Sequence, residues 1–161
     1  MRLRNSKPAD AEALAEVYRD AARNLGREGY TEEQTAVWAL YPENLESFRA
    51  ALSEGLTLCA EVGGAPVAFG QLHPNDHIAY LYCHSAHARR GYASMILVHL
   101  EDHAASQGVN LLRVEASRVA RPLFQRAGYH VVEEERPVRY GVEFVRYRME
   151  KVLPPCRPEL R

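Results

Sequence analysis

Apolar side chains recur every three or four positions in the first third of the chain, which is the period of an amphipathic helix. Leu14, Val17 and Tyr18 follow this period after Asp10, a residue type that often caps a helix N-terminus. The next periodic segment opens with a threonine and, three residues later, a glutamine, a capping box that satisfies free backbone N–H groups. The pattern predicts helices that begin near Asp10, Thr31 and Leu45.

From residue 56 onward the apolar residues come in short runs bounded by glycine, proline or asparagine, a pattern typical of β-strands. Gly63 and Gly64 separate two such runs and predict a tight hairpin, because glycine readily adopts the positive φ values of a two-residue turn. A longer segment between Gly91 and Gly108 predicts a helix. The runs predict strands over residues 2–6, 56–62, 66–73, 77–84, 111–115, 129–134 and 142–152, and helices over residues 91–107 and 120–127.

This order of elements predicts a mixed α/β sheet with helices around it. The strand–helix–strand unit over residues 78–115 should form a right-handed parallel crossover, while the other strands pair antiparallel. No repeat or low-complexity linker interrupts the chain, so we expect one domain over residues 1–153. Three prolines near the C-terminus predict a disordered tail over residues 154–161.

Composition excludes several classes of function. A formal net charge of −1 gives no reason to expect nucleic acid or an anionic membrane as the main partner. The three cysteines are widely spaced and lack metal-site spacing, so we expect neither a metal site nor a disulfide framework. The N-terminus carries no apolar signal segment, and no run of about 18 apolar residues occurs, which predicts a cytoplasmic protein.

The segment over residues 88–94 combines small and basic residues between a predicted strand and the long helix. Gly91 and Ala93 let a ligand approach the backbone, and the first N–H groups of a helix have no partners within it. The helix dipole, with Arg89 and Arg90 beside it, favours an anion at this position. The segment therefore predicts a diphosphate site, with a glycine turn and a solvated arginine pair as the alternative. The sequence lacks the glycine motifs of Rossmann and P-loop folds.

The run from Tyr80 to Ala93 resembles the main motif of the GCN5-related N-acetyltransferase (GNAT) superfamily. In that family a strand is followed by glutamine or arginine, two residues, glycine, one residue, then glycine or alanine, and a helix. Here the strand Tyr80-Leu81-Tyr82-Cys83-His84 precedes Arg89-Arg90-Gly91-Tyr92-Ala93-Ser94. Ala88 departs from the motif, because the family usually has glutamine or arginine there.

A second family signature strengthens the resemblance. Ala116-Ser117, followed by the run from Ala120 to Tyr129, resembles the strand end, short helix and glycine–aromatic pair of the family. The resemblance covers residues 2–152 and is closest to a YafP-like branch, which shares Tyr30-Thr31 and Trp38.

The resemblance implies a mostly antiparallel sheet whose central parallel strands splay apart, with acetyl-CoA as the acetyl donor. The pantetheine arm would lie in the opening, paired with the backbone of Leu81 and Cys83, while Ser117 and Phe124 flank its far end. The residues implied to bind acetyl-CoA are Leu81, Tyr82, Cys83, Ala88, Arg89, Arg90, Gly91, Tyr92, Ala93, Ser94, Ser117 and Phe124.

Acetyl transfer to an amine requires a base, a stabilised oxyanion and a proton for the thiolate. The backbone N–H of Cys83 is the candidate for the oxyanion. The family's usual acid and base positions hold Phe124 and Ala79, whose side chains transfer no proton. Candidates at strand ends are His73 and Glu115 as bases and Tyr82, Tyr140 and Tyr147 as acids. Solvated strand ends and aromatic packing are the alternatives.

An acceptor pocket is expected from the second helix and the last strands. Tyr30 and Trp38 are eight positions apart, just over two helical turns, so we expect them to share one face and wall an aromatic pocket. Arg136, Arg139 and Tyr140 in the last hairpin loop are candidates to meet a carboxylate or phosphate of the acceptor. Core packing and a solvated charged turn are the alternatives.

The leading hypothesis is an N-acetyltransferase that moves an acetyl group from acetyl-CoA directly to the primary amine of a small molecule. A peptide or protein amine is the other acceptor class. The alternative function is a non-catalytic acyl-CoA-binding or sensor module, which the residues at positions 79 and 124 keep open. The sequence leaves the oligomeric state undecided, with a homodimer as one option.

Overall fold

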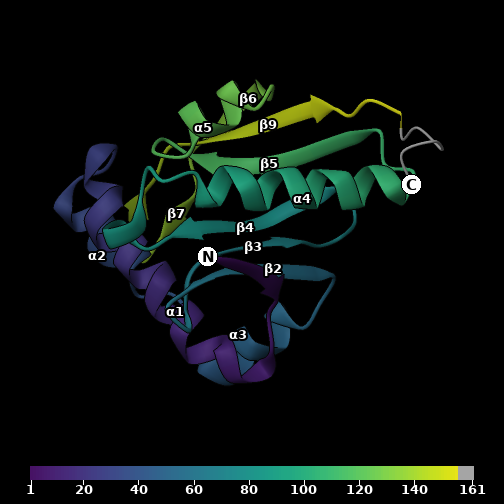
Figure 1. Ribbon diagram of the computed structural model, residues 1–161. Coiled ribbons are helices and arrows are strands. Elements are labelled where there is room, and N and C mark those ends of the chain that lie inside the picture. The colour runs from purple at the N-terminus through teal and green to yellow at the C-terminus, as the bar shows by residue number, and fades with distance from the viewer. Residues whose placement is uncertain (156–161) are drawn as a thin grey trace.

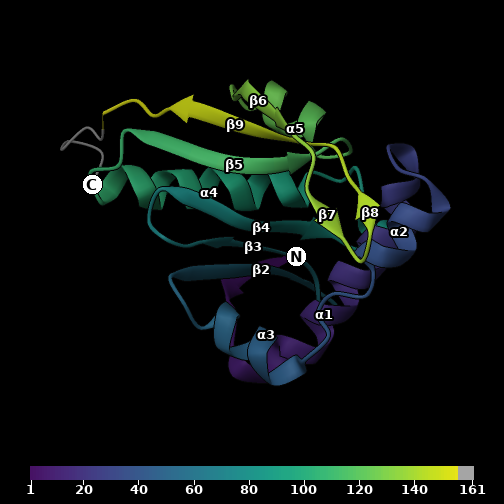
Figure 2. The same cartoon turned by 180° about the vertical axis from the view of Figure 1, so that it is seen from behind.

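The computed structural model describes residues 1–155, which form a central sheet with helices against both faces (Figures 1 and 2). The sheet has strand order β1-β2-β3-β4-β5-β9-β6, and within residues 1–155 its neighbouring strands are antiparallel except for β4 and β5. The strands are β1 (Arg2–Asn5), β2 (Leu56–Val62), β3 (Ala65–Leu72), β4 (His77–Cys83), β5 (Leu111–Ser117), β6 (His130–Glu135) and β9 (Arg146–Val152). The predicted mixed, mostly antiparallel sheet with one parallel crossover is confirmed. Most of the predicted disordered tail, residues 156–161, lies outside the described residues.

Helix α4 lies along one face of the sheet, while α1 and α3 cover the other face (Figure 1). The helices are α1 (Ala11–Asp20), α2 (Glu32–Trp38), α3 (Leu45–Leu52), α4 (Tyr92–Ser106) and α5 (Arg121–Arg126). Short turns of helix are η1 (Pro8–Asp10), η2 (Ala21–Leu25), η3 (Gly26–Glu28) and η4 (Ser85–His87). No helix within residues 1–155 is long and apolar enough to cross a membrane.

The two faces of the sheet bury separate apolar cores. On one face Ile96 and Leu100 of α4 pack with strand residues, and Gly70 of β3 allows this approach. A methyl group on Gly70 would stand 2.7 Å from Cγ2 of Ile96, so the position requires glycine. On the other face Leu14 of α1 packs in a cluster with Phe48 of α3. These two cores hold the central strands between them.

Local sequence signals account for several of the turns. The predicted capping box is confirmed, since the N–H of Gln34 donates to the hydroxyl of Thr31 at 3.1 Å and the side chain of Gln34 accepts from the N–H of Thr31. The Gly63–Gly64 turn is also confirmed, with positive φ at both residues.

Asp10, in contrast, does not cap α1 as predicted. Its carboxylate accepts two hydrogen bonds from the guanidinium of Arg4, at 2.8 and 2.9 Å, and one from the N–H of Lys7 at 2.7 Å. The short helical turn η1 places Asp10 within reach of β1, a contact that local sequence does not reveal. These bonds hold the pKa of Asp10 below its ordinary value.

The predicted last strand over residues 142–152 is interrupted. Residues 138–139 and 142–143 form a separate hairpin, β7 (Val138–Arg139) with β8 (Val142–Glu143), and the sheet strand β9 begins only at residue 146. Phe144 and Val145 leave the strand and are buried, and the ring of Phe144 lies 6.0 Å from that of Tyr30. The β7–β8 hairpin therefore stands away from the sheet, near α2 (Figure 2).

Candidate active site

The two parallel strands at the centre of the sheet separate soon after they meet. β4 and β5 pair at two positions, His77 with Arg113 and Ile78 with Val114. Both strands continue beyond these pairs, and no further pairing joins them within residues 1–155. A gap therefore opens between them toward their carboxyl ends.

A bulge in β4 determines which backbone groups face this gap. Tyr80 stands opposite Gln71 of β3, whereas Ile78 stands opposite Leu72, so Ala79 is an extra residue in β4. Such a bulge reverses the direction in which the following backbone groups point.

Beyond the bulge the N–H of His84 donates to the carbonyl oxygen of Val67 at 2.8 Å. Backbone groups alternate along a strand between its two neighbours. Because His84 points toward β3, the N–H and C=O groups of Leu81 and Cys83 point toward the gap.

The same alternation applies to β5. The N–H of Leu153 donates to the carbonyl oxygen of Asn110 at 2.9 Å, so Asn110 faces β9. The backbone groups of Glu115 and Ser117 then face the gap from the opposite side. Both edges of the gap present polar backbone groups to an extended ligand.

The turn over residues 88–94 is open to a ligand. Arg89 and Gly91 have positive φ values of 62° and 84°, which aim the turn into the start of α4. None of the N–H groups from Arg89 to Ser94 donates a hydrogen bond within residues 1–155. A side chain at Gly91 would meet no atom within 4 Å, so the space beside the turn is free. The Arg89 side chain pairs with Glu28 at 2.8 Å.

A buried carboxylate fixes the approach to this turn. Asp20, at the end of α1, is 8% exposed and accepts the N–H of Ser85 at 2.6 Å and its hydroxyl at 3.1 Å. Asn24 donates to the same carboxylate at 2.8 Å, and Nε2 of His84 lies 3.3 Å from it. Asp20 thus ties the turn η4, between β4 and the open turn, to the first helix.

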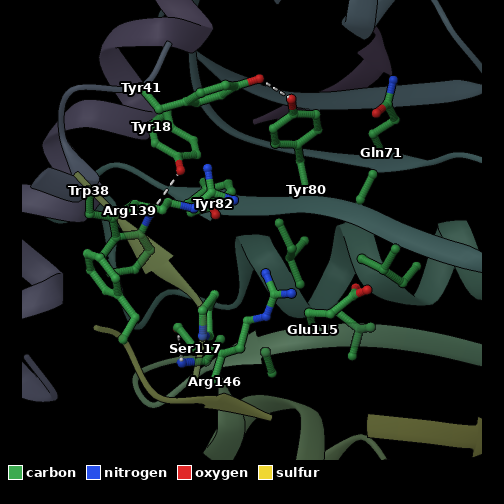
Figure 3. Close-up of a pocket in the computed structure, with 18 of the residues that line it drawn as sticks. Tyr18, Trp38, Tyr41, Gln71, Tyr80, Tyr82, Glu115, Ser117, Arg139 and Arg146 are labelled. Atoms are coloured by element: carbon green, nitrogen blue, oxygen red, sulfur yellow. Dashed lines mark hydrogen bonds between the residues drawn. The ribbon is translucent and has the colours of Figure 1, made fainter. Parts of the chain in front are cut away.

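A cavity of about 790 Å³ lies between the sheet, α1, α2 and the β7–β8 hairpin (Figure 3). Its lining includes Leu81, Ala116 and Phe124, which pack with the core on the α4 side. The cavity therefore extends into the gap between β4 and β5. Nine tyrosine, tryptophan and phenylalanine side chains line it: Tyr18, Tyr30, Trp38, Tyr41, Tyr80, Tyr82, Phe124, Tyr140 and Phe144.

Hydrogen bonds and ring contacts hold the aromatic wall in place. The indole N–H of Trp38 donates to the hydroxyl of Tyr18 at 2.9 Å, and the rings of Tyr18 and Tyr82 lie 4.4 Å apart (Figure 3). The hydroxyls of Tyr41 and Tyr80 are 2.5 Å apart. These contacts predict that Tyr18, Trp38, Tyr41, Tyr80 and Tyr82 form a rigid part of the wall, because each of these rings contacts a neighbouring ring.

Tyr30 and Trp38 are neighbours, but for a different reason from the predicted one. Tyr30 precedes α2 and does not share a helical face with Trp38, yet their ring centroids are 5.5 Å apart. The hydroxyl of Tyr30 donates to the carbonyl of Val145 at 2.6 Å and accepts the N–H of Arg118 at 2.9 Å. Tyr30 therefore ties the segment before α2 to both strand ends across the cavity.

Comparison with known proteins decides the family. Residues 27–151 match the family described as the acetyltransferase (GNAT) domain. The chain belongs to the GNAT superfamily. This membership makes it an acetyl-CoA-dependent acyltransferase, as the sequence predicted.

Individual relatives agree with the GNAT assignment. The chain is 26% identical over 149 residues to the "Uncharacterized N-acetyltransferase YafP" of Escherichia coli (strain K12), covering 92% of this chain and 94% of that protein. A GCN5-related N-acetyltransferase from Rhodopseudomonas palustris has a TM-score of 0.90 at 32% identity, over 94% of this chain and 95% of that one. The PaiA N-acetyltransferase of Thermoplasma acidophilum, solved with coenzyme A, has a TM-score of 0.75 at 18% identity, over 94% and 98%. The last likeness shows the fold alone.

In this GNAT chain Glu115 lies at the closed end of the gap, with Oε2 2.6 Å from Nε2 of His77. The contact with His77 is the main reason why the pKa of Glu115 lies below its ordinary value, with smaller contributions from Arg146 and Arg113. Partial burial opposes this shift. Glu115 is therefore ionised at neutral pH and lines the cavity.

Two other predicted catalytic side chains lie away from the open part of the gap. His73 follows β3 at the end where β4 and β5 are paired; it is near Glu54 and lines the cavity. His73 lies at this end because β3 runs antiparallel to β4, so the carboxyl end of β3 meets the start of β4. Tyr147 stands opposite Ala116, on the face that carries α4, with the guanidinium of Arg121 4.4 Å from its ring centre. It is not among the cavity-lining residues of the described chain.

The remaining predicted residues on β4, β5 and α5 have buried or engaged side chains. Burial raises the pKa of Tyr82 to about 12 and that of the Cys83 thiol to about 11. Both groups therefore stay protonated at neutral pH. Phe124 is buried, and the hydroxyl of Ser117 accepts the N–H of Ala120 at 3.0 Å. Their contacts with acetyl-CoA stay predictions.

The β7–β8 hairpin brings only some of its predicted residues to the cavity. Arg136 pairs with Glu134 and Glu143 outside the cavity lining. Arg139 and the exposed Tyr140 line the cavity, so the hairpin contributes one cation and one ring.

Sequence reasoning missed several residues that the fold brings to the cavity. These are His77, Arg146, Tyr41 and Tyr80, and Asp20 behind the neighbouring turn. Their partners are distant in the chain: His77 and Glu115 are 38 positions apart, and Tyr41 and Tyr80 are 39 apart. The parallel pairing predicted for the strands that carry His77 and Glu115 was the one sequence signal that places these two residues near each other.

Proposed function

We propose that this enzyme transfers the acetyl group of acetyl-CoA directly to the primary amine of a small molecule with an aromatic or apolar part. The observation that carries the proposal is the cavity of about 790 Å³, walled by aromatic rings and continuous with the gap between β4 and β5. Its volume lies in the range of pockets for small molecules, and such rings bind an apolar group by burial.

The donor fits the groups that the fold leaves free. The N–H groups from Arg89 to Ser94 are positioned to hold the diphosphate at the start of α4, where the helix dipole also favours an anion. Backbone groups of Leu81 and Cys83 supply strand-like partners for the pantetheine amides. Acetyl-CoA supplies an activated thioester carbonyl.

The cavity side of the gap supplies a group for the acceptor. Glu115 is ionised and reaches the cavity, so it attracts the ammonium form of an amine and accepts its proton directly or through water. The backbone N–H of Cys83 points into the gap and is the candidate donor to the oxyanion. Within this arrangement no covalent enzyme intermediate is required, in agreement with a Cys83 thiol that stays protonated.

The test is thiol release from acetyl-CoA with a panel of amines. We expect turnover with small primary amines that carry an aromatic ring, and much weaker turnover with small aliphatic amines. Acetylation of peptide N-termini or lysines in preference to every small amine would overturn the proposed acceptor class. CoA binding without turnover on any small or peptide amine would favour the sensor function instead.

A further inference from the structure

The imidazole of His77 is held between two acceptors. Its Nε2 lies 2.6 Å from Oε2 of Glu115, and its Nδ1 lies 3.1 Å from the carbonyl oxygen of His73. A carbonyl oxygen only accepts, so Nδ1 carries a proton. The other ring nitrogen, Nε2, faces the carboxylate of Glu115.

Glu115 has one oxygen engaged and one available. Oε2 is bound to His77, and Oε1 accepts no hydrogen bond within residues 1–155. Both side chains line the cavity, and that of Glu115 is the more exposed, at 31% against 19% for His77. His77 lies at the first position of the β4–β5 pairing.

Other charged groups surround the pair. On β5 Arg113 pairs with Asp76 at 3.5 Å, and on β9 Arg146 pairs with Glu135 at 2.9 Å. Figure 3 shows Arg146 extending toward the space between β4 and β5, near Glu115.

Directly opposite Glu115 on β9, Arg148 pairs with Glu133 at 3.3 Å. Next to β3, His73 lies 3.9 Å from Glu54. Neither of these two side chains bonds to His77 or Glu115 within the described chain. Most cations near Glu115 thus have another carboxylate partner, whereas His77 is bound to Glu115 itself.

We propose that His77 is the positioning residue of this enzyme: it fixes the Glu115 carboxylate at the closed end of the gap, so that Oε1 faces the acceptor amine. The inference rests on the proposed function, because Glu115 acts as a base only toward an amine. In the transfer, nitrogen forms a bond to the acetyl carbon and the carbon–sulfur bond breaks, leaving its electron pair on the coenzyme thiolate. The proton lost by nitrogen goes to Oε1 of Glu115 and then to water.

Replacing His77 by alanine should lower kcat about 10-fold at pH 7 with an unchanged KM for acetyl-CoA, because the carboxylate loses its fixed orientation. The pH profile should also change. Activity requires ionised Glu115 and is lost as pH falls through its pKa, which His77 lowers. Without His77 that pKa rises, so the ratio of variant to wild-type kcat/KM should fall as the pH is lowered from about 7 to about 5.

Two further variants separate positioning from a structural role. His77→Gln places an uncharged N–H near the position of Nε2, so it should restore most of kcat at pH 7 but keep the loss at low pH. In a Glu115→Gln background, His77→Ala should lower kcat by less than about 2-fold, since His77 acts through the carboxylate.

An equal loss of kcat from His77→Ala in the wild-type and Glu115→Gln backgrounds would overturn the inference. A pH profile of His77→Ala identical to that of the wild type would overturn it as well. These outcomes require an active wild-type enzyme. Absence of turnover on every amine would instead contradict the proposed function.

Discussion

Replacing Gly91 by valine is expected to raise the Kd of CoA by about 100-fold. Gly91 has φ of 84° at the start of α4, and the space where its side chain would project is empty. A branched side chain there strains the turn and occupies the space beside the free N–H groups. Loss of two or three hydrogen bonds to phosphate costs about 3 kcal/mol, which corresponds to about 100-fold in Kd. Isothermal titration calorimetry with CoA measures the change.

Gly108, just beyond the other end of α4, offers a matched control. It has φ of 83°, and a methyl group added to it would likewise meet no atom within 4 Å, so Gly108→Val carries the same backbone strain. Both variants should lose similar thermal stability, but only Gly91→Val should lose CoA affinity. Equal affinity in the two variants would show that the turn does not hold the phosphates.

Replacing Trp38 by alanine should raise the KM of the acceptor about 20-fold and leave the KM of acetyl-CoA within about 2-fold. Trp38 lines the cavity on the side away from α4 and packs its ring 5.5 Å from Tyr30 and 6.4 Å from Tyr82. Truncating a large aromatic contact costs about 2 kcal/mol of binding. Steady-state kinetics with an aromatic amine from the panel provides both constants.

The hydrogen bond from Trp38 to Tyr18 needs its own control, because its loss alone affects stability. Tyr18→Phe removes the hydroxyl that accepts the indole N–H and leaves both rings in place. It should therefore change the stability, while neither the KM of the acceptor nor that of acetyl-CoA should change by more than about 2-fold. If Trp38→Ala raises both KM values equally, Trp38 is a packing residue and the acceptor binds elsewhere.

Sequence patterns predicted the sheet and the turn before α4 because both depend on local signals. Gly91 and the small residues around it predict a turn into a helix, and the strand–helix–strand order predicts the parallel pairing of β4 and β5. The bulge at Ala79 was invisible to this reasoning, since it arises from the register of β4 against β3. Yet this bulge turns the backbone groups of Leu81 and Cys83 toward the gap. The family resemblance had implied these two residues as backbone partners of the pantetheine arm.

The catalytic candidates were harder to predict because their contacts join distant segments. Glu115 was a candidate from its place on β5, but its partner His77 depends on the pairing of two strands. Phe144 likewise leaves its strand for a tertiary reason, the packing against Tyr30 that builds the cavity wall. Periodicity predicts which residues are buried, but not which of them meet.

The most direct test of the donor site is a titration of the nitrogen-15-labelled protein with CoA, followed by amide NMR shifts. We expect the largest shifts at the N–H groups from Arg89 to Ser94, followed by those of Leu81 and Cys83 on the edge of the gap. Saturation with CoA while the signals from Arg89 to Ser94 stay in place would contradict the account, because the diphosphate would then be held elsewhere.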